Sequence, residues 1–233
     1  MLVCDEKLRN RHRVFRDRAH AGRLLARRLE GLIGRKAAVL AVPSGGIPVA
    51  CEVALHLNLP LAAVAVRKLP VPGDPEAGIG ALSFDGEVLL NTHLVERLGI
   101  SQEQLMQIVS RVRQDVERRQ RLFGKIPELK GREAILVDDG LASGYTMLAA
   151  VASVRKRSPA RIVVAVPTSP GRTAEALEHE VDLLVCLNLR DDPVFAVADA
   201  YRAWYDLEEG EALKILRGCQ EKKRRRVDGA MAE

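Results

Sequence analysis

Aromatic residues are scarce: four phenylalanines, three tyrosines and one tryptophan make up 3% of the 233 residues. Long hydrophobic runs are absent too, since the apolar stretches 37–42 and 61–66 are far shorter than the ~20 residues that a membrane-spanning helix needs. We therefore expect no membrane partner. The first six residues include Asp5 and Glu6 and contain no apolar core of signal-peptide length, so we expect a cytoplasmic protein.

Cysteine is also sparse, with four residues at positions 4, 51, 186 and 219. No C-x-x-C pair and no neighbouring histidine cluster completes a zinc site, so we expect reduced thiols. The pattern G-x-x-x-x-G-K-[ST] does not occur, which excludes a P-loop nucleotidase.

Positive charge is concentrated at the end of the chain. The formal net charge of +5 owes much to the five consecutive cations at 222–226. Such a run is more often solvated than bound to nucleic acid, so we expect no nucleic-acid partner. The sequence predicts a single domain over 1–220 and a basic, disordered tail over 221–233.

The apolar pattern predicts the fold class. Helical patterns alternate with short, continuously apolar runs, which are typical of strands buried on both faces. We expect a doubly wound α/β fold, with a mainly parallel five-stranded sheet and helices on both faces. The predicted strands are 37–42, 61–66, 134–137, 161–166 and 183–187.

Two segments between these strands have a different character. Residues 69–91 contain three prolines and four glycines, which predicts a long mobile loop, with 79–82 and 87–90 as a candidate hairpin. Ser101 and Gln104 form a capping-box pattern at the start of a helix that continues to Phe123. A small aromatic segment follows the last predicted strand.

The most informative stretch is 135–146, where two carboxylates follow a buried strand. The hydroxyls of Ser143 and Thr146 and the start of the next helix suit a phosphate group. Asp138 and Asp139 can accept hydrogen bonds from sugar hydroxyls or help to hold Mg²⁺. The alternative, an acidic turn facing water, leaves the Ser143-Gly144-x-Thr146 arrangement unexplained. A sugar phosphate satisfies both halves of the motif.

These residues resemble the fingerprint of the type I phosphoribosyltransferases, which has four apolar residues, two acidic residues and a short Gly/Thr-rich turn. The order of motifs is similar to that of a poorly characterised branch of this family. The resemblance implies binding of 5-phosphoribosyl 1-pyrophosphate and Mg²⁺. Asp138 and Asp139 would bind the ribose hydroxyls and, directly or indirectly, the metal. The 5-phosphate would lie against Gly140, Leu141, Ala142, Ser143, Gly144, Tyr145 and Thr146.

The resemblance extends to two further segments and shows two departures. The turn of Ser44, Gly45 and Gly46 corresponds to the family's pyrophosphate loop, and Arg67 and Lys68 could neutralise pyrophosphate charge during the reaction. Family members with such a loop commonly carry Arg in place of Ser44. Enzymes for hypoxanthine and guanine carry an Asp in place of Ala142, which argues against a 6-oxopurine acceptor.

The sequence thus predicts a phosphoribosyltransferase, with Asp138, Asp139, Arg67 and Lys68 as catalytic residues. Its partners would be phosphoribosyl pyrophosphate and a nitrogenous base, and a homodimer is compatible with the pattern. Phe195, Trp204 and Tyr205 could stack the base, or the aromatic segment could pack onto the core. The alternative function is a non-catalytic regulator of the same fold that binds phosphoribosyl pyrophosphate or a nucleotide, and nucleic acid through its basic tail.

Overall fold

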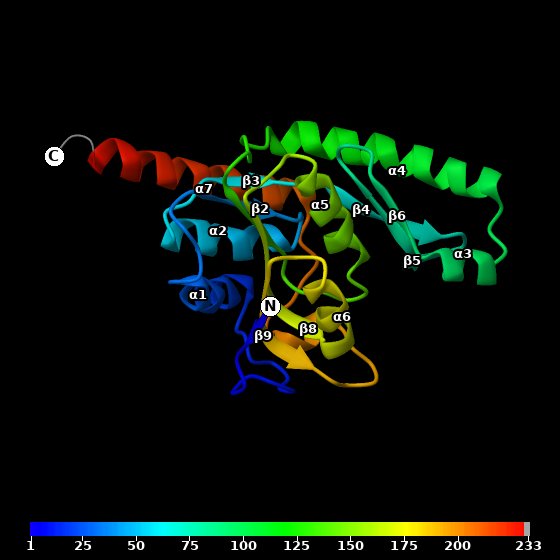
Figure 1. Cartoon of the computed structure of the whole chain (residues 1–233), viewed down its shortest axis with the longest axis horizontal. Coiled ribbons are helices and arrows are strands. Elements are labelled where there is room, and N and C mark those ends of the chain that lie inside the picture. Colours follow the sequence, from blue (N-terminus) through cyan, green and yellow to red (C-terminus); the bar gives the residue numbers. More distant parts are fainter. Residues whose placement is uncertain (231–233) are drawn as a thin grey trace.

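A six-stranded parallel sheet lies at the centre of the structure, a computed structural model that describes residues 1–230 apart from the side chains of 75–76 and 226–230 (Figure 1). The strand order is β1-β9-β8-β7-β2-β3. The strands are β1 (Leu2–Cys4), β2 (Ala37–Ala41), β3 (Leu61–Ala63), β7 (Glu133–Val137), β8 (Arg161–Pro170) and β9 (Leu183–Arg190). The doubly wound parallel fold is confirmed, with one more strand than predicted. The extra strand, β1, is only three residues long and forms by pairing with β9.

Both faces of the sheet are covered by helices, which explains why its strands are apolar without interruption. Alternate residues of one strand enter different cores: Val163 contacts the side covered by α1 (Arg18–Leu29), α2 (Gly46–His56) and α7 (Glu209–Ala230). Val164 contacts the side covered by α5 (Tyr145–Arg155) and α6 (Gly171–Glu178). Successive side chains of a strand point to opposite faces of the sheet. Because both faces are buried under helices, the side chains on both are apolar.

The segment 69–91 is not the predicted irregular loop. It contributes to a second, antiparallel sheet of β4 (Val66–Val71), β5 (Asp74–Ser83) and β6 (Val88–Leu90). Helices α3 (Thr92–Arg97) and α4 (Gln102–Phe123) follow it, and Figure 1 shows α4 along the top of this sheet. Leu69, Ile79 and Leu82 share a core with Val116 of α4, and this burial outweighs the local Gly and Pro content. The candidate hairpin was thus the better prediction.

The start of α4 follows the predicted capping box. Ser101 Oγ accepts a hydrogen bond from the Gln104 amide at 3.2 Å, and Gln104 Oε1 accepts one from the Ser101 amide at 2.9 Å. The two bonds satisfy backbone donors that have no partner within the helix. The first turn of this long helix is therefore fixed by local sequence.

The basic run continues helix α7 instead of forming a disordered tail. The helix extends from Glu209 to Ala230, so the prediction of disorder is wrong for 221–230, and residues 231–233 lie outside the described residues. Leu216 and Cys219 are buried, and Lys223 Nζ donates to the Asn58 carbonyl at 3.1 Å. These contacts fix one face of α7, and Lys223 is the member of the basic run that takes part in them, whereas Lys222, Arg224 and Arg225 are exposed. No helix in the described part of the chain is long and apolar enough to cross a membrane.

Candidate active site

The two predicted ligand loops leave neighbouring strands at the same edge of the sheet. Strands β2 and β7 are parallel and paired, with Ala41 opposite Val137. The turn of Ser44, Gly45 and Gly46 follows β2, and the loop that starts with Asp138 follows β7. Carboxyl ends of parallel strands are the usual ligand-binding edge of such folds. The motifs that are about 90 residues apart in the sequence therefore meet in space.

Glycine lets the two loops touch. A Cβ atom on Gly45 would lie 2.0 Å from Asp139 Oδ2, and one on Gly46 would lie 2.6 Å from the Val137 carbonyl oxygen. No side chain fits at either position without moving the acidic pair or its strand. The Pro43–Ser44 peptide bond just before them is cis. The backbone of the Ser44 turn is therefore packed directly on the carboxylate of Asp139.

Arg18 holds that carboxylate in place. Its Nε donates to Asp139 Oδ2 at 2.8 Å, and the two side chains are only 8% and 13% exposed. The Arg18 guanidinium also lies 3.9 Å from the centre of the Trp204 ring and donates to the Tyr205 carbonyl at 2.9 Å. The Tyr201 hydroxyl donates to the Asp139 backbone carbonyl at 2.6 Å. Side chain and backbone of Asp139 are thus both fixed from outside the loop.

Burial changes the proton affinity of these groups. It raises the pKa of Asp138 well above its usual value, and the neighbouring Asp139 carboxylate raises that pKa further. Burial also raises the pKa of Asp139, but the Arg18 guanidinium opposes the effect. The pKa of Tyr201 is raised by burial, which keeps its hydroxyl a hydrogen-bond donor. A ligand that donates to Asp138 or brings a cation would favour its ionised form.

The loop after the acidic pair leaves an open turn in front of a helix. Ala142 and Ser143 are exposed, Gly144 has a φ of 83°, and α5 begins at Tyr145. The Leu141 side chain is buried, and its amide donates to the Thr168 carbonyl at 2.9 Å. Backbone amides at a helix start favour anions. Ser143 is exposed and Thr146 is half-buried, whereas the Leu141 side chain belongs to the core.

The two predicted cations lie on the antiparallel sheet. Arg67 and Lys68 are both exposed residues of β4. Arg67 Nε donates to Asp115 Oδ2 of α4 at 2.8 Å, so the structure pairs it with α4 and not with the acidic pair. The stem of Lys68 packs over Gly78, where a Cβ atom would lie 2.6 Å from Lys68 Cγ. Both cations therefore belong to the antiparallel sheet and not to the loops at the edge of the central sheet.

The aromatic candidates have different surroundings. The Trp204 ring contacts the Arg18 guanidinium on the one hand and the Tyr201 ring on the other, with 5.1 Å between the two ring centres. These contacts correspond to the alternative in which the aromatic segment packs onto the core. Tyr205 is 53% exposed, and its hydroxyl donates to Glu211 at 2.7 Å. The Arg190 guanidinium lies 5.7 Å from the centre of the Phe195 ring. Of the three rings, Tyr205 is exposed, whereas Phe195 and Trp204 are both half-buried.

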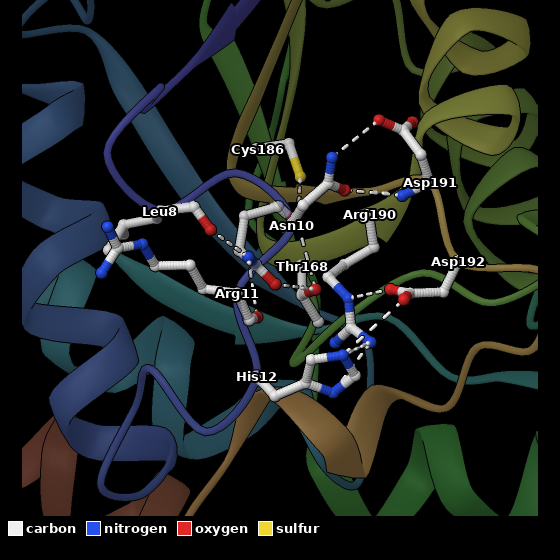
Figure 2. Close-up of polar contacts among 10 residues, drawn as sticks. Leu8, Asn10, Arg11, His12, Thr168, Cys186, Arg190, Asp191 and Asp192 are labelled. Atoms are coloured by element: carbon white, nitrogen blue, oxygen red, sulfur yellow. Dashed lines mark hydrogen bonds and ion pairs between the residues drawn. The ribbon is translucent and has the colours of Figure 1, made fainter.

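A second polar cluster, shown in Figure 2, lies next to the loop 140–144 that precedes α5. Arg190, at the end of β9, is fully buried, bonds to Asp192 and reaches the His12 ring at 3.0 Å. Asn10 and Asp191 exchange two hydrogen bonds of 3.1 and 2.8 Å. These contacts fix the N-terminal segment over the ends of β8 and β9. The Thr168 carbonyl, which accepts from Leu141, connects the cluster to the loop.

Sequence reasoning assigned no role to several residues that shape this edge. Arg18 lies in the segment Phe15-Arg16-Asp17-Arg18, one of the motifs whose order is similar to that of the family branch, and this was a usable signal. Arg119, whose Nη2 donates to Ser44 Oγ at 3.1 Å, is one of five arginines on α4, and nothing in their spacing distinguishes it. Tyr201 and Arg190 act through contacts between distant segments, which no local pattern reports.

The acidic pair supplies two carboxylates for a divalent cation. Among the described residues, no group of three or more His, Cys, Asp or Glu side chains is placed to hold a metal ion. Mg²⁺ commonly binds through one or two carboxylates together with substrate phosphates and water. Asp138 and Asp139 fit such an ion when a phosphorylated substrate brings it.

Comparisons with known proteins agree with this geometry. The family model described as phosphoribosyl transferase domain matches residues 16–202. A Mycobacterium tuberculosis H37Rv protein named "Putative phosphoribosyl transferase Rv0571c" is 38% identical over 212 residues, covering 88% of this chain and 46% of that protein. This chain therefore spans about half the length of that relative.

Solved structures show the same likeness. The protein TT1426 from Thermus thermophilus is 36% identical with a TM-score of 0.70, and the match covers 87% of this chain and 97% of that one. A hypothetical protein from Neisseria gonorrhoeae, solved with bound ppGpp, has a TM-score of 0.50 at 13% identity, covering 89% and 97% of the two chains. The second likeness concerns the fold alone.

Proposed function

The chain belongs to the phosphoribosyl transferase domain family, and from this membership we propose that it moves a 5-phosphoribosyl group from phosphoribosyl pyrophosphate to a nitrogenous base. One observation carries the proposal: the Gly45 backbone packs against the Asp139 carboxylate, where no Cβ would fit. This contact supports the proposal because it brings the turn proposed to bind the diphosphate next to the acidic pair proposed to bind the sugar hydroxyls. That is the arrangement a phosphorylated sugar diphosphate requires.

Each part of the site has a role in this proposal. Asp138 and Asp139 accept hydrogen bonds from the ribose hydroxyls, while the amides of 140–146 and the hydroxyls of Ser143 and Thr146 hold the 5-phosphate. The Ser44 turn binds the pyrophosphate. Arg67 and Lys68 supply positive charge from the neighbouring sheet. Arg18 keeps Asp139 oriented before the substrate arrives, because its own position is fixed by Trp204 and the Tyr205 carbonyl.

The reaction is a displacement at the anomeric carbon. The bond from this carbon to the pyrophosphate oxygen breaks, the bond to the base nitrogen forms, and the proton on that nitrogen is released. Positive charge develops on the sugar ring and negative charge on the leaving group. Fixed carboxylates and cations stabilise these charges, and positioning of the two reactants supplies much of the rate. Mg²⁺ bound with the substrate would neutralise part of the diphosphate charge near Asp138 and Asp139.

The acceptor is restricted by what the loop lacks. Ala142, exposed at the turn, has no group that could exchange a proton with a base. We therefore propose an acceptor other than hypoxanthine or guanine, with Phe195 and Tyr205 as stacking surfaces. Trp204 is already covered by Arg18 and Tyr201, so its contribution is to position Arg18.

Pyrophosphate release tests the proposal. The full chain is incubated with phosphoribosyl pyrophosphate, Mg²⁺ and a panel of bases that includes adenine, uracil, hypoxanthine and guanine. We expect release that depends on one base and is lost in an Asp138→Asn/Asp139→Asn variant. Binding of phosphoribosyl pyrophosphate without release for any base would instead support the regulator alternative.

A further inference from the structure

The Ser44 turn contains no basic residue, yet a guanidinium from another layer reaches it. No Lys or Arg occurs between Pro43 and Pro48. Arg119, near the end of α4, donates from Nη2 to Ser44 Oγ at 3.1 Å across 75 residues of sequence. Ser44 is next to Gly45, whose backbone touches Asp139. The Arg119 guanidinium therefore contacts, through the Ser44 hydroxyl, the turn that packs on the acidic pair.

Arg119 is buried and incompletely paired. Its side chain is 6% exposed, and Nη1 forms an ion pair with Glu209 Oε2 at 2.9 Å. Its Nε is a buried donor without a hydrogen-bond partner among the described residues. Burial lowers the pKa of Arg119, and the nearby Arg67 charge adds to that effect. A buried cation with an unused donor gains free energy when an anion approaches.

The charges around Arg119 leave a positive excess. Arg67 and Arg118 both bind Asp115, and Arg118 and Arg119 both bind Glu209. Three guanidinium groups thus share two carboxylates. Arg118 is 48% exposed, so water screens its charge, whereas Arg119 is screened far less. Of the two adjacent arginines, only Arg119 donates to the Ser44 turn within the described part of the chain.

We propose that Arg119 is the cation of the pyrophosphate end of the site: it holds the Ser44 hydroxyl and stabilises the negative charge that develops on a diphosphate leaving group bound at Ser44–Gly46. The inference rests on the proposed function. It adds a charge that the turn itself lacks, from a helix outside the central sheet. Glu209 at the start of α7 positions Arg119, so α4 and α7 both contribute to the site.

Separate titrations with inorganic pyrophosphate and with ribose 5-phosphate, each with Mg²⁺, test the role. Arg119→Met is expected to weaken pyrophosphate binding by about tenfold or more, because a charge-assisted contact is lost. Ribose 5-phosphate, held by residues 140–146, should keep its affinity. Arg119→Lys should recover part of the pyrophosphate affinity by restoring the charge without the planar fork.

Two further variants separate binding from structure. Arg118→Met is the matched control, since it loses the same Glu209 partner without touching Ser44, and should leave both affinities within about twofold. Ser44→Ala keeps the buried Arg119 charge and should also weaken the binding of pyrophosphate without changing that of ribose 5-phosphate. If Arg119→Met lowers the affinity for both ligands equally, or if Ser44→Ala lowers neither, the role of the Arg119–Glu209 ion pair is purely structural. Either result would overturn the inference. A wild-type protein that binds ribose 5-phosphate but not pyrophosphate overturns it as well, whereas binding of neither ligand removes the proposed function itself.

Discussion

Arg18 Nε and Asp139 Oδ2 lie 2.8 Å apart, although 121 residues separate them in the sequence. The pair joins the first residue of α1 to the loop after β7, and both side chains are almost fully buried. Removing one member of such a pair leaves an uncompensated charge in a site of low polarity. The ion pair therefore couples the stability of the fold to the geometry of the ligand site.

Arg18→Met is expected to lower the free energy of unfolding by about 3–5 kcal/mol, because it leaves Asp139 buried without its cation and removes the contact with Trp204. Urea denaturation followed by circular dichroism measures the change.

A double-mutant cycle with Asp139→Asn serves as the control for this effect. The double variant should be less destabilised than the sum of the two single changes, because neither charge is then left alone. Additive losses would mean that the two residues do not interact.

Protons should leave Asp138 when the substrate binds. Its raised pKa keeps the carboxyl protonated to higher pH than an exposed Asp, and hydrogen bonds from ribose hydroxyls favour the ionised form. Calorimetric binding enthalpies in buffers of different ionisation enthalpy should therefore show proton release near the folded pKa, and Asp138→Asn should show none. Proton uptake in the wild type would contradict the assignment.

The same group makes stability depend on pH in the unliganded protein. Because the folded-state pKa of Asp138 is raised, its contribution is fully present below the unfolded pKa of about 3.9 and declines as pH rises through the folded pKa. Replacement by Asn removes that decline. Urea midpoints of wild type and Asp138→Asn should therefore diverge with increasing pH, with the variant relatively more stable at the upper end.

Gly45→Ala should abolish tight substrate binding without unfolding the protein. The new methyl group would lie 2.0 Å from Asp139 Oδ2, so the carboxylate must leave Arg18 or the turn must move. We expect at least about a tenfold loss of affinity, equivalent to ~1.4 kcal/mol. Gly218→Ala in α7 is the control: its methyl group meets no atom within 4 Å, and it should stabilise the helix by about 0.5–1 kcal/mol.

The cations of α7 should be dispensable for turnover. Lys222, Arg224 and Arg225 lie in the helix beyond its buried residues. Replacing all three with Gln should leave base-dependent pyrophosphate release within about twofold, since none of them contacts the acidic pair or the ligand turns. A loss of salt-dependent nucleic-acid binding in the same variant would favour the regulator alternative, because charge neutralisation governs such binding.

Much of the central sheet could be predicted because burial on two faces leaves a continuous apolar signal, as in β7 and β9. The antiparallel sheet was harder, since Pro70 and Gly80 suggest a loop, while Leu69, Ile79 and Leu82 share a core with Val116 of α4. The sequence also predicted that the Ser44 turn and the acidic pair each follow an apolar strand, which the structure shows at the ends of β2 and β7, whereas the ligands of the two turns are what the family resemblance implies. The helical state of 221–230 was not, because it depends on Leu216 and Cys219 packing onto α2 and the sheet.

The partners of the acidic pair could not be read from the sequence. Arg18 and Arg119 are two of many arginines, and their importance comes from burial and from contacts made across 121 and 75 residues. Hydrophobic periodicity reports which face of a helix is buried, but not which of its polar residues is enclosed with it. The partner of Arg119 at the start of α7, Glu209, is 90 residues further along the chain.

Calorimetric titration of the full chain with phosphoribosyl pyrophosphate and Mg²⁺, beside the Asp138→Asn/Asp139→Asn variant, tests the central claim most directly. The account predicts tight, Mg²⁺-dependent binding to the wild type and its loss in the variant, with the fold unchanged by circular dichroism. No binding to the wild type, or equal binding to the variant, would contradict the assignment of the acidic pair and the two ligand turns to this substrate.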